Sequence, residues 1–275
     1  MNINNINNKS NPIGVFDSGI GGLSVLRQLV KIMPNEDFVY LGDTARVPWG
    51  NKSKETINDY SIQCTDFLME HNVKLIVVAC NTASSYAIPS VVTEAHGINV
   101  VEMIIPAAKA AFENSNTKRI GIVGTRATIR SNAYHNAILK HSTFDNAKIY
   151  SVSCPMFVPI VEEGLIKHES ARLIAKEYLQ PLIEAEIDTL VLGCTHYPFL
   201  SELIKELMPN VKLIDTGYYA AKEALKIIDN ENISQGKENK GSIKMFLTDS
   251  PADFLEIAKG YLDFELPKPI KIELI

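Results

Sequence analysis

Two cysteines occupy positions from which they could move protons. Cys80 and Cys194 each follow an apolar run and precede a polar stretch, in the segments ACNTA and GCTHY. In open parallel sheets, ligands bind at the carboxyl ends of the strands, which is where such residues would lie. A thiolate can accept a proton and a thiol can return one. Two thiols on opposite faces of a bound molecule therefore predict acid/base chemistry.

The residues alone leave two other interpretations of this pair open. Cysteine is among the most buried residue types, so both thiols could belong to a core, although a core strand would continue apolar where Thr stands here. Cys80, Cys194 and His196 also offer three side chains of the kinds that bind zinc. The remaining cysteines, Cys64 and Cys154, are assigned to the core.

Ionisable residues near the two cysteines would tune proton transfer. Asp17 follows the first apolar run, His196 comes two residues after Cys194, and Glu162 lies in VPIVEEG before the helix that leads to Cys194. An imidazolium stabilises a neighbouring thiolate, and a carboxylate can accept an S–H hydrogen bond or help to move a proton. Glu162 as a solvated helix residue and His196 as a structural histidine are the ordinary alternatives.

A glycine-rich turn, DSGIGG (17–22), opens an expected helix. It lacks G-x-G-x-x-G spacing and no Walker lysine follows, so a nucleotide site is the weaker interpretation. Backbone N–H groups at a helix start, together with the Ser18 hydroxyl, suit a small carboxylate. We expect the turn to bind one.

Short apolar runs alternate with helical stretches along the whole chain. Continuous apolar strands of this kind indicate parallel sheets that are covered on both faces, so the fold class is α/β. The expected strands are Ile13–Phe16, Phe38–Leu41, Leu75–Ala79, Val100–Val101, Ile120–Val123, Ile149–Val152, Leu190–Leu192 and Leu213–Ile214.

The runs also repeat at a nearly constant offset. Two copies of one βαβ-type unit, each with a strand that ends in a cysteine, are the simplest interpretation. If the two units face each other, Cys80 and Cys194 approach one cleft from opposite sides. The matching segments are IGVFDS (13–18) with IGIVGT (120–125), VVACNTA (77–83) with VLGCTHY (191–197), and Ser53–Glu70 with His168–Glu184.

The chain of 275 residues is long enough for two domains. We expect a disordered polar tail over 1–12, a discontinuous first α/β domain over 13–105 plus 217–275, and a second over 106–216. The C-terminal segment is too small for a core of its own, so it should pack back on the first unit. Its expected elements are a helix at about 218–230, a strand over Ile243–Leu247, a helix over Ala252–Leu262 and a strand over Ile270–Leu274.

Composition excludes several classes of protein. A net charge of −5 argues against a protein that mainly grips nucleic acid or anionic lipid. No apolar run approaches the roughly 18–20 residues that a membrane span needs. The first twelve residues are polar and Asn-rich, without an apolar signal core, so we expect a cytoplasmic protein that contacts neither membrane nor nucleic acid.

Five segments together resemble glutamate racemase, of the aspartate/glutamate racemase superfamily, in the expected order and over nearly the whole chain from about residue 12. They are DSGIGGLSVL (17–26), GDTARVPWG (42–50), ACNTAS (79–84), FVPIVEEG (157–164) and LGCTHYPFL (192–200). The resemblance implies two similar, pseudo-twofold related α/β domains with the site in the cleft between them, in a homodimer. It also implies interconversion of L- and D-glutamate without a cofactor or metal, supplying D-glutamate for peptidoglycan, cell-wall biogenesis and cell shape.

The resemblance assigns roles motif by motif. Cys80 and Cys194 would be the two acid/bases on opposite faces of Cα, assisted by Asp17, Glu162 and His196. The substrate-binding residues would be Asp17, Ser18, Pro48, Trp49, Gly50, Cys80, Asn81, Thr82, Thr125, Thr195 and His196.

One residue departs from the family pattern, and other activities compete. The family usually has Tyr where Trp49 stands, which puts any hydrogen bond from that phenol in doubt. An aspartate or other amino-acid racemase of the superfamily is the nearest alternative, although such relatives tend to carry Glu at His196. A nucleophilic thiol enzyme would need one dominant cysteine with a partner base, and a regulatory binding protein is the non-enzymatic alternative.

Overall fold

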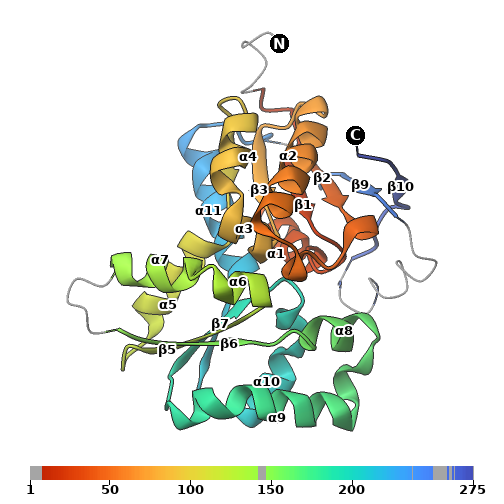
Figure 1. The fold of residues 1–275 in the computed structure, drawn as a ribbon. Helices are drawn as coiled ribbons and strands as arrows, with labels where there is room; N and C mark the ends of the chain where they lie inside the picture. Colours follow the sequence, from red (N-terminus) through yellow and green to blue (C-terminus); the bar gives the residue numbers. More distant parts are fainter. Residues whose placement is uncertain are drawn as a thin grey trace.

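Two parallel β-sheets with helices on both faces organise the molecule. The computed structural model describes residues 8–141, 147–236, 238–249 and 264–274, together with 259 and 262. The strand order is β10-β9-β2-β1-β3-β4 in one sheet and β6-β5-β7-β8 in the other, and Figure 1 shows the first sheet above the second. The paired strands run parallel throughout. The predicted α/β class is confirmed.

The expected strands form, and each end lies within one residue of its predicted position. Strands β1, β2, β3 and β7 are buried along their full length, which explains their uninterrupted apolar sequences. The bounds are β1 Ile13–Asp17, β2 Phe38–Gly42, β3 Leu75–Val78, β4 Asn99–Val101, β5 Arg119–Gly124, β6 Lys148–Ser153, β7 Thr189–Gly193 and β8 Lys212–Asp215.

The internal repeat corresponds to a repeated topology. The order β2-β1-β3-β4 of the first sheet recurs as β6-β5-β7-β8 in the second. Helix α2 (Lys54–Glu70) leads into β3, and helix α9 (Glu169–Glu184) leads into β7. Ser53 and His168 cap these two helices, each by accepting a backbone N–H. Cys80 and Cys194 therefore follow equivalent strands.

Helices cover both faces of each sheet. Helices α1 and α11 pack on one face of the first sheet, and α2 and α4 pack on the other. Helix α9 covers one face of the second sheet, while α5 and α7 cover the other. The remaining bounds are α1 Leu23–Ile32, α3 Asn81–Tyr86, α4 Ile88–Glu94, α5 Ile104–Asn114, α6 Arg126–Arg130, α7 Ala133–His141, α8 Phe157–Glu162, α10 Ser201–Leu207 and α11 Thr216–Asn230.

The C-terminal segment returns to the first sheet. Strand β9 (Ile243–Leu247) has the predicted bounds and pairs with β2. Strand β10 is shorter than predicted, because only Ile270–Lys271 form the ladder with β9. Helix α11 begins two residues early, since the Asp215 carboxylate caps its first turn. The helix expected over Ala252–Leu262 lies outside the described residues, apart from single positions.

The expected N-terminal tail is only partly described. Residues 1–7 lie outside the described part of the chain, and the carbonyl groups of Lys9 and Ser10 accept hydrogen bonds from later segments. The buried Lys74 ammonium donates to the carbonyl oxygen of Lys9, to that of Ile233 and to the Glu36 carboxylate. The charge of Lys74 is thus paired and hydrogen-bonded, as burial requires. No helix of the described residues is long and apolar enough to cross a membrane.

Candidate active site

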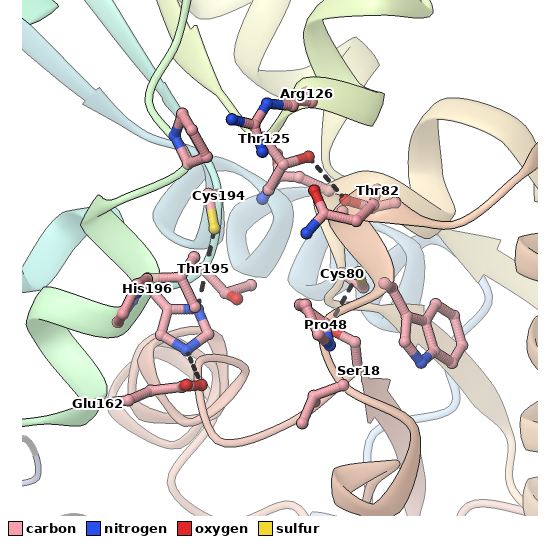
Figure 2. Close-up of a pocket in the computed structure, with 18 of the residues that line it drawn as sticks. Ser18, Pro48, Cys80, Thr82, Thr125, Arg126, Glu162, Cys194, Thr195 and His196 are labelled. Carbon is pink, nitrogen blue, oxygen red and sulfur yellow. Dashed lines mark hydrogen bonds and ion pairs between the residues drawn. The ribbon is translucent and has the colours of Figure 1, made fainter.

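A cavity of about 370 Å³ lies where the carboxyl ends of the two sheets meet, and both predicted thiols line it. Figure 2 shows Cys80 and Cys194 on different walls of this pocket. Every residue predicted for the site except Asp17 lines the cavity. They are Ser18, Pro48, Trp49, Gly50, Cys80, Asn81, Thr82, Thr125, Glu162, Cys194, Thr195 and His196.

Cys80 lies just beyond β3 and caps helix α3. Its Sγ accepts the backbone N–H of Ala83 at 3.5 Å and lies 3.5 Å from the Ser18 hydroxyl oxygen. The side chain is buried. Burial, together with the nearby Asp17 carboxylate, raises the pKa of the Cys80 thiol to about 12. Near neutral pH, Cys80 is therefore protonated in the unliganded protein.

Asp17 lies behind the cavity wall rather than in it. Its Oδ2 accepts the backbone N–H groups of Gly19 at 3.0 Å and Gly22 at 2.9 Å. Burial raises the pKa of Asp17, while His196 and the backbone N–H groups oppose the rise. The expectation that the N–H groups of this turn face a ligand is wrong for Gly19 and Gly22, because Asp17 occupies them. Ser18 is the residue of the turn that reaches the cavity.

Cys194 lies beside a histidine–carboxylate pair. Its Sγ is 3.8 Å from His196 Nδ1, and His196 Nε2 is 2.9 Å from Glu162 Oε1 (Figure 2). Burial lowers the pKa of His196, but hydrogen bonds to Cys194 and Glu162 outweigh that effect and raise it to about 10. At neutral pH the imidazole is therefore protonated, and its positive charge lies next to Cys194.

Two glycines let loops of the first unit contact the second unit at the site. A Cβ atom at Gly21 would clash with the His196 ring and the Thr195 hydroxyl, so this close approach requires glycine. A Cβ at Gly50 would lie 2.8 Å from Cβ of Thr125. The Ser24 hydroxyl also donates to the Thr195 carbonyl at 2.7 Å. The glycine-rich turn therefore packs against the residues that follow Cys194, which the sequence did not reveal.

Asn81 is held by buried residues of later elements. The Tyr134 hydroxyl donates to Asn81 Oδ1 at 2.5 Å, and Asn81 Nδ2 lies 3.4 Å from the Thr216 hydroxyl. Tyr134 and Thr216 are almost fully buried. Sequence reasoning missed both, because nothing local marks a tyrosine in α7 as a partner of a residue more than fifty positions earlier. Thr82 and Thr125 meet across the same region, with hydroxyl oxygens 3.0 Å apart.

Trp49 makes a hydrogen bond despite lacking the phenol. Its indole N–H donates to Asp43 Oδ2 at 3.1 Å, and its ring lies 5.5 Å from that of Tyr60. Asp43 does not line the cavity, whereas Trp49 does. Since the indole has a single polar hydrogen and Asp43 takes it, Trp49 offers the cavity an apolar surface.

Seven lining residues escaped sequence reasoning. Five are apolar and form much of the wall, while Asn51 and Arg126 are polar. Arg126 and Pro155 come shortly after β5 and β6, so the carboxyl-end rule could have found them. In the described ranges, no three His, Cys, Asp or Glu side chains converge as metal ligands would. The missed residues are Val47, Asn51, Arg126, Pro155, Met156, Val158 and Pro159.

The fold and site define a class: a doubled parallel α/β protein in which each unit contributes one thiol to a shared cavity. Residues 13–224 match the model of the Asp/Glu/Hydantoin racemase family. The chain belongs to this family and is an amino-acid racemase.

Named relatives agree with this membership. The chain is 48% identical to a glutamate racemase of Sulfurihydrogenibium sp. over 96% of this chain and 97% of that protein. It is 44% identical to a glutamate racemase of Persephonella marina, covering 88% and 90% of the two chains. The crystal structure of glutamate racemase from Francisella tularensis in complex with D-glutamate matches with a TM-score of 0.90 at 37% identity, covering 97% and 98%.

Proposed function

We propose that this protein is a glutamate racemase that interconverts L- and D-glutamate with Cys80 and Cys194 as its two bases and without a cofactor. The observation that carries the proposal is that both thiols, from equivalent strands of a doubled unit, line a single cavity. Its volume of about 370 Å³ suits a small amino acid. The similarity to glutamate racemases supports glutamate as that amino acid.

In the proposed reaction, Cα of glutamate lies between the two sulfur atoms. One thiolate takes the Cα proton, so that a C–H bond breaks and an S–H bond forms. The opposite thiol then gives its proton to the other face, which inverts the centre. The turnover consumes no external reductant or oxidant, and the two cysteines end with their protonation states exchanged.

The two thiols lie in different electrostatic surroundings, which supports different roles for them. Burial and Asp17 keep Cys80 neutral at ordinary pH. Protonated His196, held by Glu162, supplies positive charge beside Cys194. We infer that Asp17, Glu162 and His196 assist the proton transfers in this way rather than by touching Cα.

The carbanion that forms at Cα needs stabilisation, because this proton is very weakly acidic. Negative charge would move into the neighbouring carboxylate, where preorganised donors lower its energy. Ser18, Asn81, Thr82 and Thr195 bring such donors to the cavity. Closure of the cleft around the substrate would exclude water and strengthen these hydrogen bonds.

We further propose the biological setting that such a reaction implies. D-Glutamate from this reaction would enter peptidoglycan synthesis and so serve cell-wall biogenesis and cell shape, in the cytoplasm, with the enzyme acting as a homodimer. Residues 13–105 plus 217–275 would form one domain and 106–216 the other. The pairing of β9 with β2 supports this division.

Optical assays without pyridoxal phosphate test the activity. L-Glutamate, D-glutamate and L-aspartate are supplied separately, and circular dichroism follows the loss of optical activity. We expect racemisation of both glutamate enantiomers, with deuterium at Cα of the product in D₂O before equilibrium is reached. Inactivity on glutamate would overturn the proposal, and turnover of aspartate alone would favour the aspartate racemase alternative.

A further inference from the structure

The cavity holds one charged side chain that the proposed reaction does not use. The charged residues that line it within the described part of the chain are Glu162, His196 and Arg126. Glu162 and His196 neutralise each other at 2.9 Å. Arg126 makes no ion pair with any described residue. Its positive charge is therefore uncompensated within the described part of the wall.

Arg126 lies at the mouth of the pocket. It is the first residue of α6, directly after Thr125, and its side chain is exposed. Figure 2 shows Arg126 beyond Thr125, at the end of the pocket away from Glu162. The hydroxyl groups next to Arg126 do not need its guanidinium as a hydrogen-bond donor, because they lie within hydrogen-bond distance of one another. The Thr125 hydroxyl is 3.0 Å from those of Thr82 and Thr128.

Glutamate carries two carboxylates and one ammonium, so its net charge is −1. The other donors that we place in the site are neutral hydroxyl and amide groups, and the His196–Glu162 pair adds no net charge. A cation at the mouth of a low-dielectric pocket raises the local concentration of an anionic ligand and speeds its capture. Charge complementarity thus favours a dicarboxylic amino acid over a neutral one.

We propose that Arg126 is the electrostatic capture residue that draws the anionic amino acid into the cavity and favours it over uncharged amino acids. This inference rests on the proposed function. Arg126 acts on binding, because Cys80 and Cys194 carry the proton transfers of the proposed reaction. A group that stabilises ground state and transition state equally changes KM and leaves kcat almost unaltered.

Helix α6 offers a matched control. Arg130 lies one turn after Arg126 on the same helix and is also exposed, but it does not line the cavity. R126Q and R130Q remove the same charge from the same element, and R126K keeps it. Loss of a cation from the first turn of a helix does not disfavour folding, because the helix dipole disfavours positive charge there.

The kinetic experiment compares glutamate racemisation by these variants at several salt concentrations. We expect R126Q to lower kcat/KM about three- to tenfold at low salt through KM, with kcat within about twofold. The gap should shrink at high salt, because salt screens exposed charges. R130Q and R126K should resemble the parent protein. Equal behaviour of R126Q and R130Q, or of R126K and R126Q, would overturn the inference.

A binding experiment separates this inference from the reaction. Trp49 is the single tryptophan of the chain and lines the cavity, so its fluorescence reports occupancy. Racemic glutamate is the ligand, because turnover cannot change its composition. Weaker binding in R126Q alone, without racemisation by the parent protein, would sustain the role of Arg126 and overturn the proposed activity. Absence of binding to the parent protein would overturn both.

Discussion

The two halves of the molecule share a topology but surround their thiols differently. Cys80 lies near the Asp17 carboxylate, and burial with that charge raises its pKa to about 12. Cys194 lies 3.8 Å from the ring of protonated His196. The doubled unit brings two like groups to one cavity, while the unlike neighbours give them opposite electrostatic environments. Duplication supplies the shared geometry, and divergence of the neighbouring residues makes the surroundings of the two thiols different.

A second pair of equivalent residues shows a similar divergence. Glu102 directly follows β4 and Asp215 is the last residue of β8, and each carboxylate accepts backbone N–H groups of the helix that comes next. Burial raises the pKa of Glu102 to about 7. Burial also raises the pKa of Asp215, but a hydrogen bond from Gln28 opposes the rise. Glu102 has no such side-chain donor among the described residues.

Removing either thiol should have the largest effect. We expect Cys80→Ser and Cys194→Ser each to lower kcat by about 10³-fold or more in both directions, because a serine hydroxyl is a far weaker acid than a thiol. Circular dichroism measures turnover from each enantiomer. Cys64→Ala, in the core of the first unit, is the control and should keep near-normal turnover. Near-normal racemisation by either serine variant contradicts the two-base assignment.

Substitution of the neighbours of Cys194 should reduce turnover less than loss of a thiol does, and by different amounts in the L-to-D and D-to-L directions. We expect His196→Asn to lower kcat about 10- to 100-fold, since asparagine cannot carry the positive charge. Glu162→Gln should lower kcat in the same direction but by less. The enantiomers have equal free energies, so kcat/KM must stay equal in the two directions. The inequality should therefore appear in kcat and in the Cα deuterium isotope effects. Equal changes of kcat and of the isotope effects in the two directions would contradict different roles for Cys80 and Cys194.

Removal of the hydrogen bond that Asn81 accepts from Tyr134 should have a smaller effect on turnover. Tyr134→Phe leaves Asn81 Oδ1 without its donor in a buried position, which should cost about 1–2 kcal/mol of stability and lower kcat/KM a few-fold. Tyr86→Phe also loses one hydrogen bond, to the Ala127 carbonyl, but leaves Asn81 untouched. Urea unfolding and steady-state kinetics measure both variants. A normal kcat/KM in Tyr134→Phe would show that Thr216 alone positions Asn81.

The smallest effect on turnover is expected at Glu102. Its folded-state pKa of about 7 exceeds the usual value, so the folded protein keeps this proton to a higher pH than the unfolded chain does. Its contribution to the free energy of unfolding is therefore present at pH 4 and lost as the pH rises to about 7.

Glu102→Gln removes this titration. As the pH rises from 4.5 to 7.5, the free energy of unfolding of the variant should increase by about 1–3 kcal/mol relative to that of the parent protein. Urea unfolding at the two pH values measures the change, with Asp215→Asn as the matched variant, for which we expect a smaller one. A parallel pH dependence in parent and Glu102→Gln would assign the titration to another group.

Much of the fold was predictable because its determinants are local. Short apolar runs flanked by turns and separated by helical stretches predict parallel strands, so β1 through β8 lie within one residue of expectation. The carboxyl-end rule then places residues such as Ser18, Cys80 and Cys194 around one cavity. The family resemblance added Pro48–Gly50, which do not directly follow a strand.

Long-range contacts were not predictable, because no local pattern encodes them. The turn around Gly19 looks like a ligand cradle in sequence, yet its N–H groups bind Asp17 once that carboxylate is buried. Tyr134 supports Asn81 only because the folded molecule brings α7 close to the first residue of α3. Trp49 keeps a hydrogen bond because Asp43 lies within reach.

For Cys80 and Cys194, the sequence and the tertiary structure determine different properties. The sequence by itself determined the α/β class, the doubling, and a thiol at an equivalent strand end in each copy, since periodicity and residue type suffice for these. Only the tertiary structure decided the electrostatics, because pKa values depend on burial and on charges brought close from distant segments. The same packing placed Arg126, which has no ion-pair partner among the described residues, at the wall of the cavity.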